Sequence, residues 1–257
     1  MDLATARAAV SETGWLSHQP KGFRNELLRR TTLKSYRKGE YLYHLEDAPG
    51  MMFGVVEGAV LIGVAHPIVG LYQAHLGRPG DWYGEAAALH GVNRRVAVEA
   101  VVPVQILCLP IKAVQKMLEE QPSWQKNFSA LLLWNQENAI RTATDLLIKD
   151  PKARVCARLL TLCGVRDGNN LPKGAIELPL TQDQFAMMCG LSRKSVHLAL
   201  RRLESEGFCE NRYGGIVVSS AEALEKSLVS FGTRSERATL VRRKSQGLKA
   251  AGCYMSG

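Results

Sequence analysis

Apolar residues recur at helical spacing on both sides of a glycine-containing break at residues 190–192. They are Phe185, Met188 and Cys189 before the break, and Val196, Leu200 and Leu203 after it. Ser192 is a favourable N-cap for a helix that starts after the break, and Gly207 is a favourable residue to end it. The spacing therefore predicts two short helices joined by a tight turn, which is the arrangement of a helix-turn-helix.

The second of these helices is expected to carry a basic face. Opposite its apolar side lie Arg193, Lys194, His197, Arg201 and Arg202, and the only acidic residues are Glu204 and Glu206 near its end. Positive charge in the first turn opposes the helix dipole, so an anionic partner would explain the arrangement. The pattern favours a helix that enters the major groove of double-stranded DNA. A plain helical hairpin with a solvated basic face is the alternative.

Two β-rich runs follow the basic helix, at residues 208–213 and 216–218, and Gly214-Gly215 separates them. Two glycines between such runs are typical of a β-hairpin. A further short strand, Ile176–Leu178, is expected before the first of the two helices. The order predicts a winged helix-turn-helix, which favours DNA binding over a plain hairpin.

Glycine-punctuated β-rich runs dominate residues 33–122. The clearest are Met52–Val56, Ala59–Val64, Val96–Val102 and Val104–Leu109. Short strands closed by turn residues at this spacing indicate an antiparallel barrel or roll. No helical pattern long enough for a βαβ crossover interrupts them, which argues against a nucleotide-binding parallel sheet. Residues 1–32 are expected to form a small helical segment, with Phe23, Leu27 and Leu28 on one face.

A long helix is expected after the roll, because residues 123–149 contain neither glycine nor proline. A seam with alternating steps of four and three runs along it through Leu132, Gln136, Ala139, Ala143 and Leu146. This spacing resembles that of a coiled coil. Further apolar residues exceed what one contact within the chain needs: Leu131, Leu133, Ile140 and Leu147. We therefore predict a homodimer helix, and packing of this face on the roll of the same chain is the alternative.

The predicted division of the chain places a hinge at Asp150-Pro151, with Asp150 as N-cap and Pro151 at the first helical position. Residues 1–32 form an N-terminal helical segment, 33–122 a β-roll sensor domain, 123–149 a dimerisation helix, 150–230 a winged helix-turn-helix, and 231–257 a basic tail. The fold class is thus α+β, with an antiparallel roll of the double-stranded β-helix or jelly-roll type. The tail is expected to be disordered, and it either strengthens DNA binding non-specifically or is simply solvated.

Composition agrees with a soluble protein of two domains. The chain has 257 residues, of which 46% are hydrophobic and 22% charged, and its net charge of +9 fits a polyanionic partner. No apolar run approaches the ~20 residues needed to span a bilayer, and the N-terminus lacks the apolar core of a signal peptide, so we expect a cytoplasmic protein without a membrane partner. The six cysteines form no CxxC pair, and buried reduced thiols are expected.

Two motifs carry a resemblance to the Crp–Fnr superfamily of bacterial transcription regulators, over about residues 15–229. One is Gly84-Glu85-Ala86-Ala87-Ala88-Leu89 with Arg94-Arg95-Val96-Ala97, which is similar to the family's phosphate-binding cassette. The other is Leu191-Ser192-Arg193-Lys194-Ser195-Val196, which is similar to the start of the family's recognition helix. The resemblance implies that Glu85 holds a ribose hydroxyl and that Arg95 pairs with a cyclic phosphate. Without a ligand, Glu85 and Arg95 could satisfy each other as a salt bridge.

The chain also departs from the cyclic-AMP-binding members. Val96 stands where they usually have serine or threonine. In those members, hydroxyl residues on the dimer helix meet the purine, and the nearest matching positions here hold Ala139 and Ile140. The expected effector site is therefore Gly84, Glu85, Arg95, Val96, Ala139 and Ile140. It would hold a nucleotide-like or other small anionic effector, with weak or absent binding of cyclic AMP.

Neither an iron–sulfur cluster nor haem is expected. No cysteine precedes Cys108, whereas the oxygen-sensing members carry an N-terminal cysteine cluster. His66, His75 and His90 fit no pattern of haem ligands, and each is predicted to be a surface or turn histidine.

The predicted function is sequence-specific DNA binding by a homodimer on a near-palindromic operator, with RNA polymerase as a further partner. The predicted DNA-binding residues are Arg193 and Lys194 at base edges, Leu198 as an apolar contact, His197 on the same face, and Gln182, Ser192 and Ser195 at phosphates. An effector-independent regulator with a purely structural roll is one alternative. An enzyme that uses Glu85 and His90 as an acid–base pair is another. We do not expect an enzyme, because the sequence has no nucleophile motif and no metal-ligand spacing.

Overall fold

The N-terminal segment forms three short helices in the computed structural model of the protein: α1 (Leu3–Ser11), α2 (Gly14–Ser17) and α3 (Lys21–Arg29). The structure describes residues 1–68, 70–165 and 174–232. The side chain of Asp2 caps α1 by accepting a hydrogen bond from the backbone N–H of Thr5 at 2.8 Å. The predicted apolar face is confirmed, because Phe23, Leu27 and Leu28 of α3 are buried.

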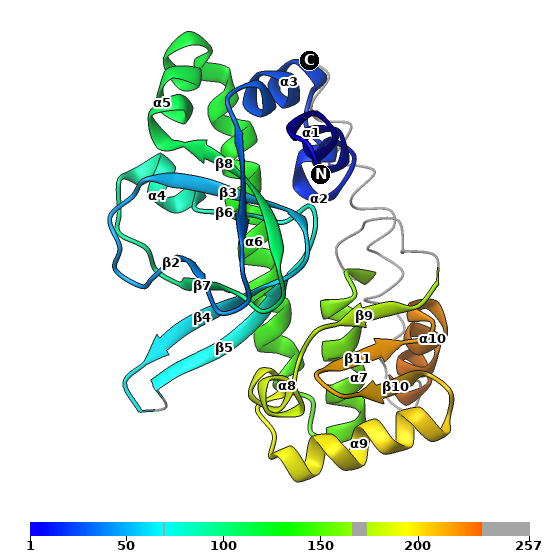
Figure 1. The fold of residues 1–257 in the computed structure, drawn as a ribbon. Coiled ribbons are helices and arrows are strands. Elements are labelled where there is room, and N and C mark those ends of the chain that lie inside the picture. Colours follow the sequence, from blue (N-terminus) through cyan, green and yellow to red (C-terminus); the bar gives the residue numbers. More distant parts are fainter. Residues whose placement is uncertain (69, 166–173, 233–257) are drawn as a thin grey trace.

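Eight short strands form two four-stranded antiparallel sheets (Figure 1). They are β1 (Thr32–Tyr36), β2 (Tyr41–Tyr43), β3 (Met51–Glu57), β4 (Val60–His66), β5 (Gly70–Gly77), β6 (Trp82–Tyr83), β7 (Ala97–Ala100) and β8 (Val104–Pro110). One sheet has the order β1-β8-β3-β6 and the other β2-β7-β4-β5. The predicted antiparallel roll is thereby confirmed, and the four runs singled out in the sequence are β3, β4, β7 and β8.

A tight contact between Gly54 and Trp82 joins β3 to β6. The strands pair at these two residues, and a Cβ on Gly54 would lie 2.5 Å from the indole ring of Trp82. The indole is fully buried and packs edge-on against Trp15 of the N-terminal helices. Any side chain larger than hydrogen at position 54 would therefore displace the aromatic core between the roll and the helical segment.

Helices α4 (Glu85–His90) and α5 (Ile111–Glu120) flank the roll, and a 3₁₀ turn at Pro122–Trp124 leads into the long helix α6 (Gln125–Asp145). In Figure 1, α6 runs alongside the roll toward the C-terminal part of the chain. The prediction of a helix over 123–149 was too long at its end. The helix stops at Asp145, whose buried carboxylate accepts a hydrogen bond from Thr161 Oγ1 at 3.0 Å.

The C-terminal part comprises α7 (Pro151–Leu162), β9 (Ile176–Leu178), α8 (Gln182–Cys189), α9 (Arg193–Ser205), β10 (Cys209–Arg212), β11 (Gly215–Val218) and α10 (Ala221–Gly232). The strands form an antiparallel sheet of order β10-β11-β9 beside the two helices α8 and α9. The predicted winged helix-turn-helix is confirmed. The division of the chain into domains at residue 150 stays a prediction.

Local capping explains how the helices of this part begin and end. Asp150 accepts a hydrogen bond from Ala153 N at 2.8 Å, with Pro151 at the first helical position, as predicted. Ser192 accepts one from Ser195 N at 3.1 Å and so caps α9, also as predicted. Gly190, with φ +57°, ends α8, and Gly207, with φ +78°, follows the end of α9. Both glycines adopt the left-handed conformation that other residues avoid.

The cysteines of the described residues, Cys108, Cys156, Cys163, Cys189 and Cys209, are buried and free, as predicted. Burial raises the pKa of the Cys156 thiol to about 12. Within the described part of the chain, no helix is long and apolar enough to cross a membrane. Cys253 lies outside the described residues, as does nearly all of the predicted tail.

Candidate functional site

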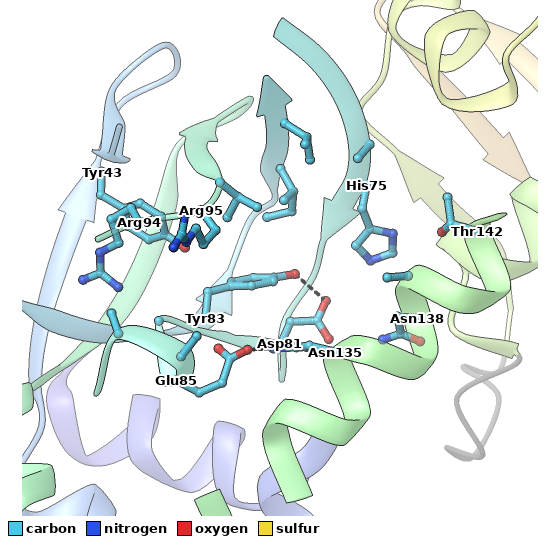
Figure 2. A pocket seen from close by; sticks show the side chains of 18 of the residues that line it. Tyr43, His75, Asp81, Tyr83, Glu85, Arg94, Arg95, Asn135, Asn138 and Thr142 are labelled. Carbon is cyan, nitrogen blue, oxygen red and sulfur yellow. Dashed lines mark hydrogen bonds between the residues drawn. The ribbon is translucent and has the colours of Figure 1, made fainter. Parts of the chain in front are cut away.

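A cavity of about 430 Å³ lies between the roll, the cassette around α4 and the long helix α6 (Figure 2). The polar residues that line it are Tyr43, His75, Asp81, Tyr83, Glu85, Asn93, Arg94, Arg95, Asn135, Asn138 and Thr142. Of the residues predicted for an effector, Gly84, Glu85, Arg95, Val96 and Ala139 also line this cavity. Ile140 does not, because its side chain is 54% exposed on another face of α6.

Glu85 begins α4 with its carboxylate buried in the cavity wall. Gly84 before it has φ +101°, and a Cβ there would lie 2.6 Å from Arg94 Nη1 and 2.9 Å from the carbonyl oxygen of Met51. Burial raises the pKa of Glu85 above its ordinary value, against the effect of a hydrogen bond from Asn135. That bond runs from Asn135 Nδ2 to Glu85 Oε1 at 3.0 Å. The glycine and the asparagine therefore fix where this carboxylate faces.

Glu85 and Arg95 do not form the salt bridge that the sequence left possible in the absence of a ligand. Arg95 is exposed, whereas Arg94 beside it is buried, and the described residues hold no ion pair between Glu85 and either arginine. Arg95 lies in the bend just before β7, whereas Arg94 packs against Tyr43 and the carbonyl oxygen of Met51. The spacing of the motif predicted Arg95 as the inward arginine, but the buried arginine in the structure is Arg94.

The guanidinium of Arg94 is held against the end of the roll. Its Nη2 donates to the carbonyl oxygen of Met51 at 2.5 Å, and its Cζ lies 4.3 Å from the ring centroid of Tyr43. Burial lowers the pKa of Arg94 from its ordinary value. Its Nε and Nη1 are buried without a hydrogen-bond partner. Arg94 thus offers hydrogen-bond donors that sequence reasoning did not assign to the site.

Helix α6 presents polar groups to the cavity at positions that the sequence reasoning also missed. Asn135, Asn138 and Thr142 line it from one side of the helix, at spacings of three and four residues. Ala139 lies between them, as expected. Ala139 and Ile140, the positions considered from the sequence, carry no hydroxyl, but Thr142 supplies one to the cavity about a turn away. Their helical spacing is the signal that could have identified these residues.

The predicted position of His75, which lies in β5, is also wrong. It was predicted to be a surface or turn histidine, but it lines the cavity, and Figure 2 shows its imidazole beside the labelled residues of α6. Its Nδ1 is buried without a hydrogen-bond partner. Burial and the positive charges of Arg158 and Arg78 lower the pKa of His75 to about 3, so its imidazole is neutral near pH 7. His66 and His90 are exposed, as predicted.

The second candidate surface is the outward face of α9, which lies at the end of the molecule away from the roll in Figure 1. The predicted DNA contacts Arg193, Lys194, His197 and Leu198 are all exposed on it. Ser192 and Ser195 lie at the start of α9, where their hydroxyl oxygens are 2.9 Å apart, and Gln182 begins α8. The guanidinium of Arg193 approaches the Asp183 carboxylate at 3.5 Å in an exposed ion pair. Tyr213 is fully exposed at the turn of the wing, and the sequence analysis did not give it as a DNA contact.

The sequence matches known families in both regions. A cyclic nucleotide-binding domain matches residues 33–121, and a Crp-like helix-turn-helix domain matches residues 153–227. The chain belongs to the Crp–Fnr family of transcription regulators. The predicted function class is confirmed: the protein is a DNA-binding transcription regulator with an effector-binding domain, and it is not an enzyme.

Three similar proteins illustrate the relationship. The cAMP-activated global transcriptional regulator CRP of Pasteurella multocida is 26% identical over 79% of this chain and 91% of its own length. A transcriptional regulator of the CRP/FNR family from Thermus thermophilus has 25% identity and a TM-score of 0.57 over 77% of this chain and 98% of its own. FixK2 from Bradyrhizobium japonicum, at 23% identity and a TM-score of 0.65 over 76% of this chain and 96% of its own, shares the fold.

Proposed function

We propose that the protein acts as a two-fold homodimer that binds a near-palindromic operator. The observation that carries this proposal is an exposed apolar stripe along α6. Leu133 and Ile140 of α6 lie seven residues apart and are 59% and 54% exposed, and Leu147, just beyond the end of the helix, is 78% exposed. Apolar side chains at this interval form the seam of paired helices. A symmetric pair of α6 helices would cover the stripe and place two copies of α9 at half-sites ~34 Å apart.

We assign the recognition of base edges to the first residues of α9. Arg193 and Lys194 are exposed there, and Arg193 can pair with guanine O6 and N7 after release from its exposed ion pair with Asp183. Leu198 can offer only an apolar contact, such as to a thymine methyl group, and His197 lies on the same face. The remaining predicted contacts, Gln182, Ser192 and Ser195, suit phosphates, which position a protein without specifying sequence.

The cavity is proposed to bind a small polar or anionic effector other than cyclic AMP. Arg94, with two buried nitrogen atoms that lack partners, supports a ligand with acceptor groups. Val96 carries no hydroxyl at a cavity position where the cyclic-AMP-binding members of the family have one. Each polar ligand group left without a partner would cost roughly 1–3 kcal/mol. RNA polymerase is proposed as a further partner in transcription.

The test is selection of bound DNA from a random library, with and without a metabolite extract, followed by gel shifts at two salt concentrations. We expect a near-palindromic consensus whose binding depends on the extract. A consensus without two-fold symmetry would contradict the homodimer. Equal operator affinity with and without the extract would instead favour the alternative of a purely structural roll.

A further inference from the structure

A buried arginine joins the DNA-binding part of the chain to the wall of the cavity. Arg158 lies in α7 and is fully buried. Its Nη1 donates to Thr142 Oγ1 of α6 at 2.8 Å, and its Nη2 donates to the carbonyl oxygen of Ala74 in β5 at 3.1 Å. A buried cation is costly unless its hydrogen bonds are made, so the guanidinium constrains all three elements at once.

The acceptors at Thr142 and Ala74 both belong to residues of the cavity wall. Thr142 and Ala74 line the cavity, and His75 follows Ala74 in the chain. In Figure 2, His75 of β5 and Thr142 of α6 lie on the same side of the cavity. A ligand that reaches this side meets the residues that hold Arg158 in place.

Further contacts hold α7 and α8 to the same two elements. Thr161, three residues after Arg158, donates to Asp145, three residues after Thr142. The hydroxyl of Tyr72 in β5 donates to the carbonyl oxygen of Met187 in α8 at 2.5 Å. At the far end of β5, Arg78 packs so closely on Gly164 that a Cβ there would lie 2.3 Å from Arg78 Nη1. Strand β5 is thus fastened to the DNA-binding part at several points.

Helix α7 in turn carries the recognition helix α9. Leu159, beside Arg158, shares one buried core with Leu200 and Leu203 of α9. Lys152 at the start of α7 pairs with Glu206 at the end of α9. Because packed cores transmit displacement rather than absorb it, a change in the position of α7 moves α9 with it.

We propose that Arg158 is a positioning residue. Its hydrogen bond to the Thr142 hydroxyl in the cavity wall fixes the position of α7, and α7 fixes the position of the recognition helix α9. The proposal rests on the homodimer of the proposed function, because two half-sites at a fixed spacing require two recognition helices at a fixed spacing. If the two recognition helices already hold this spacing before DNA binds, less free energy is spent on ordering them when the operator is bound. Binding to unrelated DNA depends on charge alone and does not require that spacing.

The experiment compares Thr142→Val with Thr142→Ser, since valine keeps the shape of the side chain but removes the hydroxyl, and serine keeps the hydroxyl. Thr144→Val is the matched control, because the Thr144 hydroxyl is exposed on the same helix and donates to the Arg141 carbonyl oxygen. Affinity for the selected operator and for unrelated DNA is measured by fluorescence anisotropy at one salt concentration. We expect Thr142→Val to weaken operator binding about tenfold with unrelated DNA unchanged. Thr142→Ser and Thr144→Val should stay within about twofold of the unmodified protein.

A second variant, Arg158→Met, checks that both residues act through one contact. Its operator affinity should fall at least as far, and adding Thr142→Val to it should cause no further loss, because coupled residues are not additive. Unchanged operator binding in Thr142→Val, equal loss for both DNAs, or additive effects in the double variant would each overturn the proposal. If the unmodified dimer itself selects no operator, the proposed function fails instead.

Discussion

Asn135 Nδ2 donates to Glu85 Oε1 at 3.0 Å and also to the carbonyl oxygen of Trp82 at 3.0 Å, so one amide of α6 joins the cassette to the adjoining strand β6. The bond stabilises a carboxylate that burial would otherwise favour in its protonated form. Asn135→Leu should therefore lower the free energy of unfolding by about 1–3 kcal/mol, measured by urea denaturation. In Glu85→Gln the amide oxygen can still accept from Asn135, so a smaller loss is expected. An equal loss in both variants would contradict this role for the asparagine.

Dimerisation should depend on the exposed face of α6 around Ala139 and Ile140. Ile140→Glu places like charges across the two-fold axis without touching the cavity, and Ala139→Glu does so from a position that lines it. Both should give monomers in sedimentation experiments and abolish tight operator binding. Lys126→Glu, exposed in the first turn of the same helix, is the control. If Ile140→Glu stays dimeric and binds normally, the dimer axis lies elsewhere.

Arg193→Ala should change sequence preference more than affinity. Loss of a bidentate contact to guanine costs ~1–3 kcal/mol of discrimination, so the preference should relax at one base pair in each half-site. Competition binding with operators substituted at each position measures this. Arg201→Ala, farther along α9, serves as the comparison. Uniform weakening across all sequences would make Arg193 a phosphate contact.

His75 should make the protein sensitive to acid. Its pKa is lowered to about 3 in the folded protein, against about 6.5 in the unfolded chain. Between these values the unfolded state binds more protons, so stability falls as the pH falls from about 6.5 toward 3. His75→Gln lacks this titration, and its unfolding free energy should decline less steeply over that range. Parallel pH profiles of the two proteins would show that the imidazole titrates normally.

Cyclic nucleotides should bind poorly to the cavity. Calorimetry with cyclic AMP and cyclic GMP is expected to detect no micromolar binding, because Val96 provides no hydroxyl at its place in the cavity wall. Val96→Ser should raise the affinity for cyclic AMP, by up to about tenfold, through one restored hydrogen bond. Micromolar binding of cyclic AMP by the unmodified protein, with higher operator affinity, would contradict the proposed effector class.

The sequence by itself determined the elements whose cause is local. Short β-rich runs closed by turn residues predicted strands β3, β4, β7 and β8 of the roll, and caps at Asp150 and Ser192 together with Gly207 marked the limits of the C-terminal helices. Strands β1, β2, β5 and β6 were not singled out. The sequence of β5, GLYQAHLG, lacks a clear alternation, and β6 has only two residues, so pairing with neighbouring strands creates them.

Only the tertiary structure decided which side chains meet in the cavity. Motif spacing identified Glu85 and Arg95, but a spacing rule cannot tell which of two adjacent arginines packs inward, and Arg94 does. The neutral state of His75 depends on burial beside Arg158, which comes from α7, 83 positions later in the chain. The last residue of helix α6, Asp145, likewise makes a long-range contact, because its carboxylate accepts a hydrogen bond from Thr161 of α7. Such long-range contacts have no trace in local periodicity, since they arise only when distant segments are packed together.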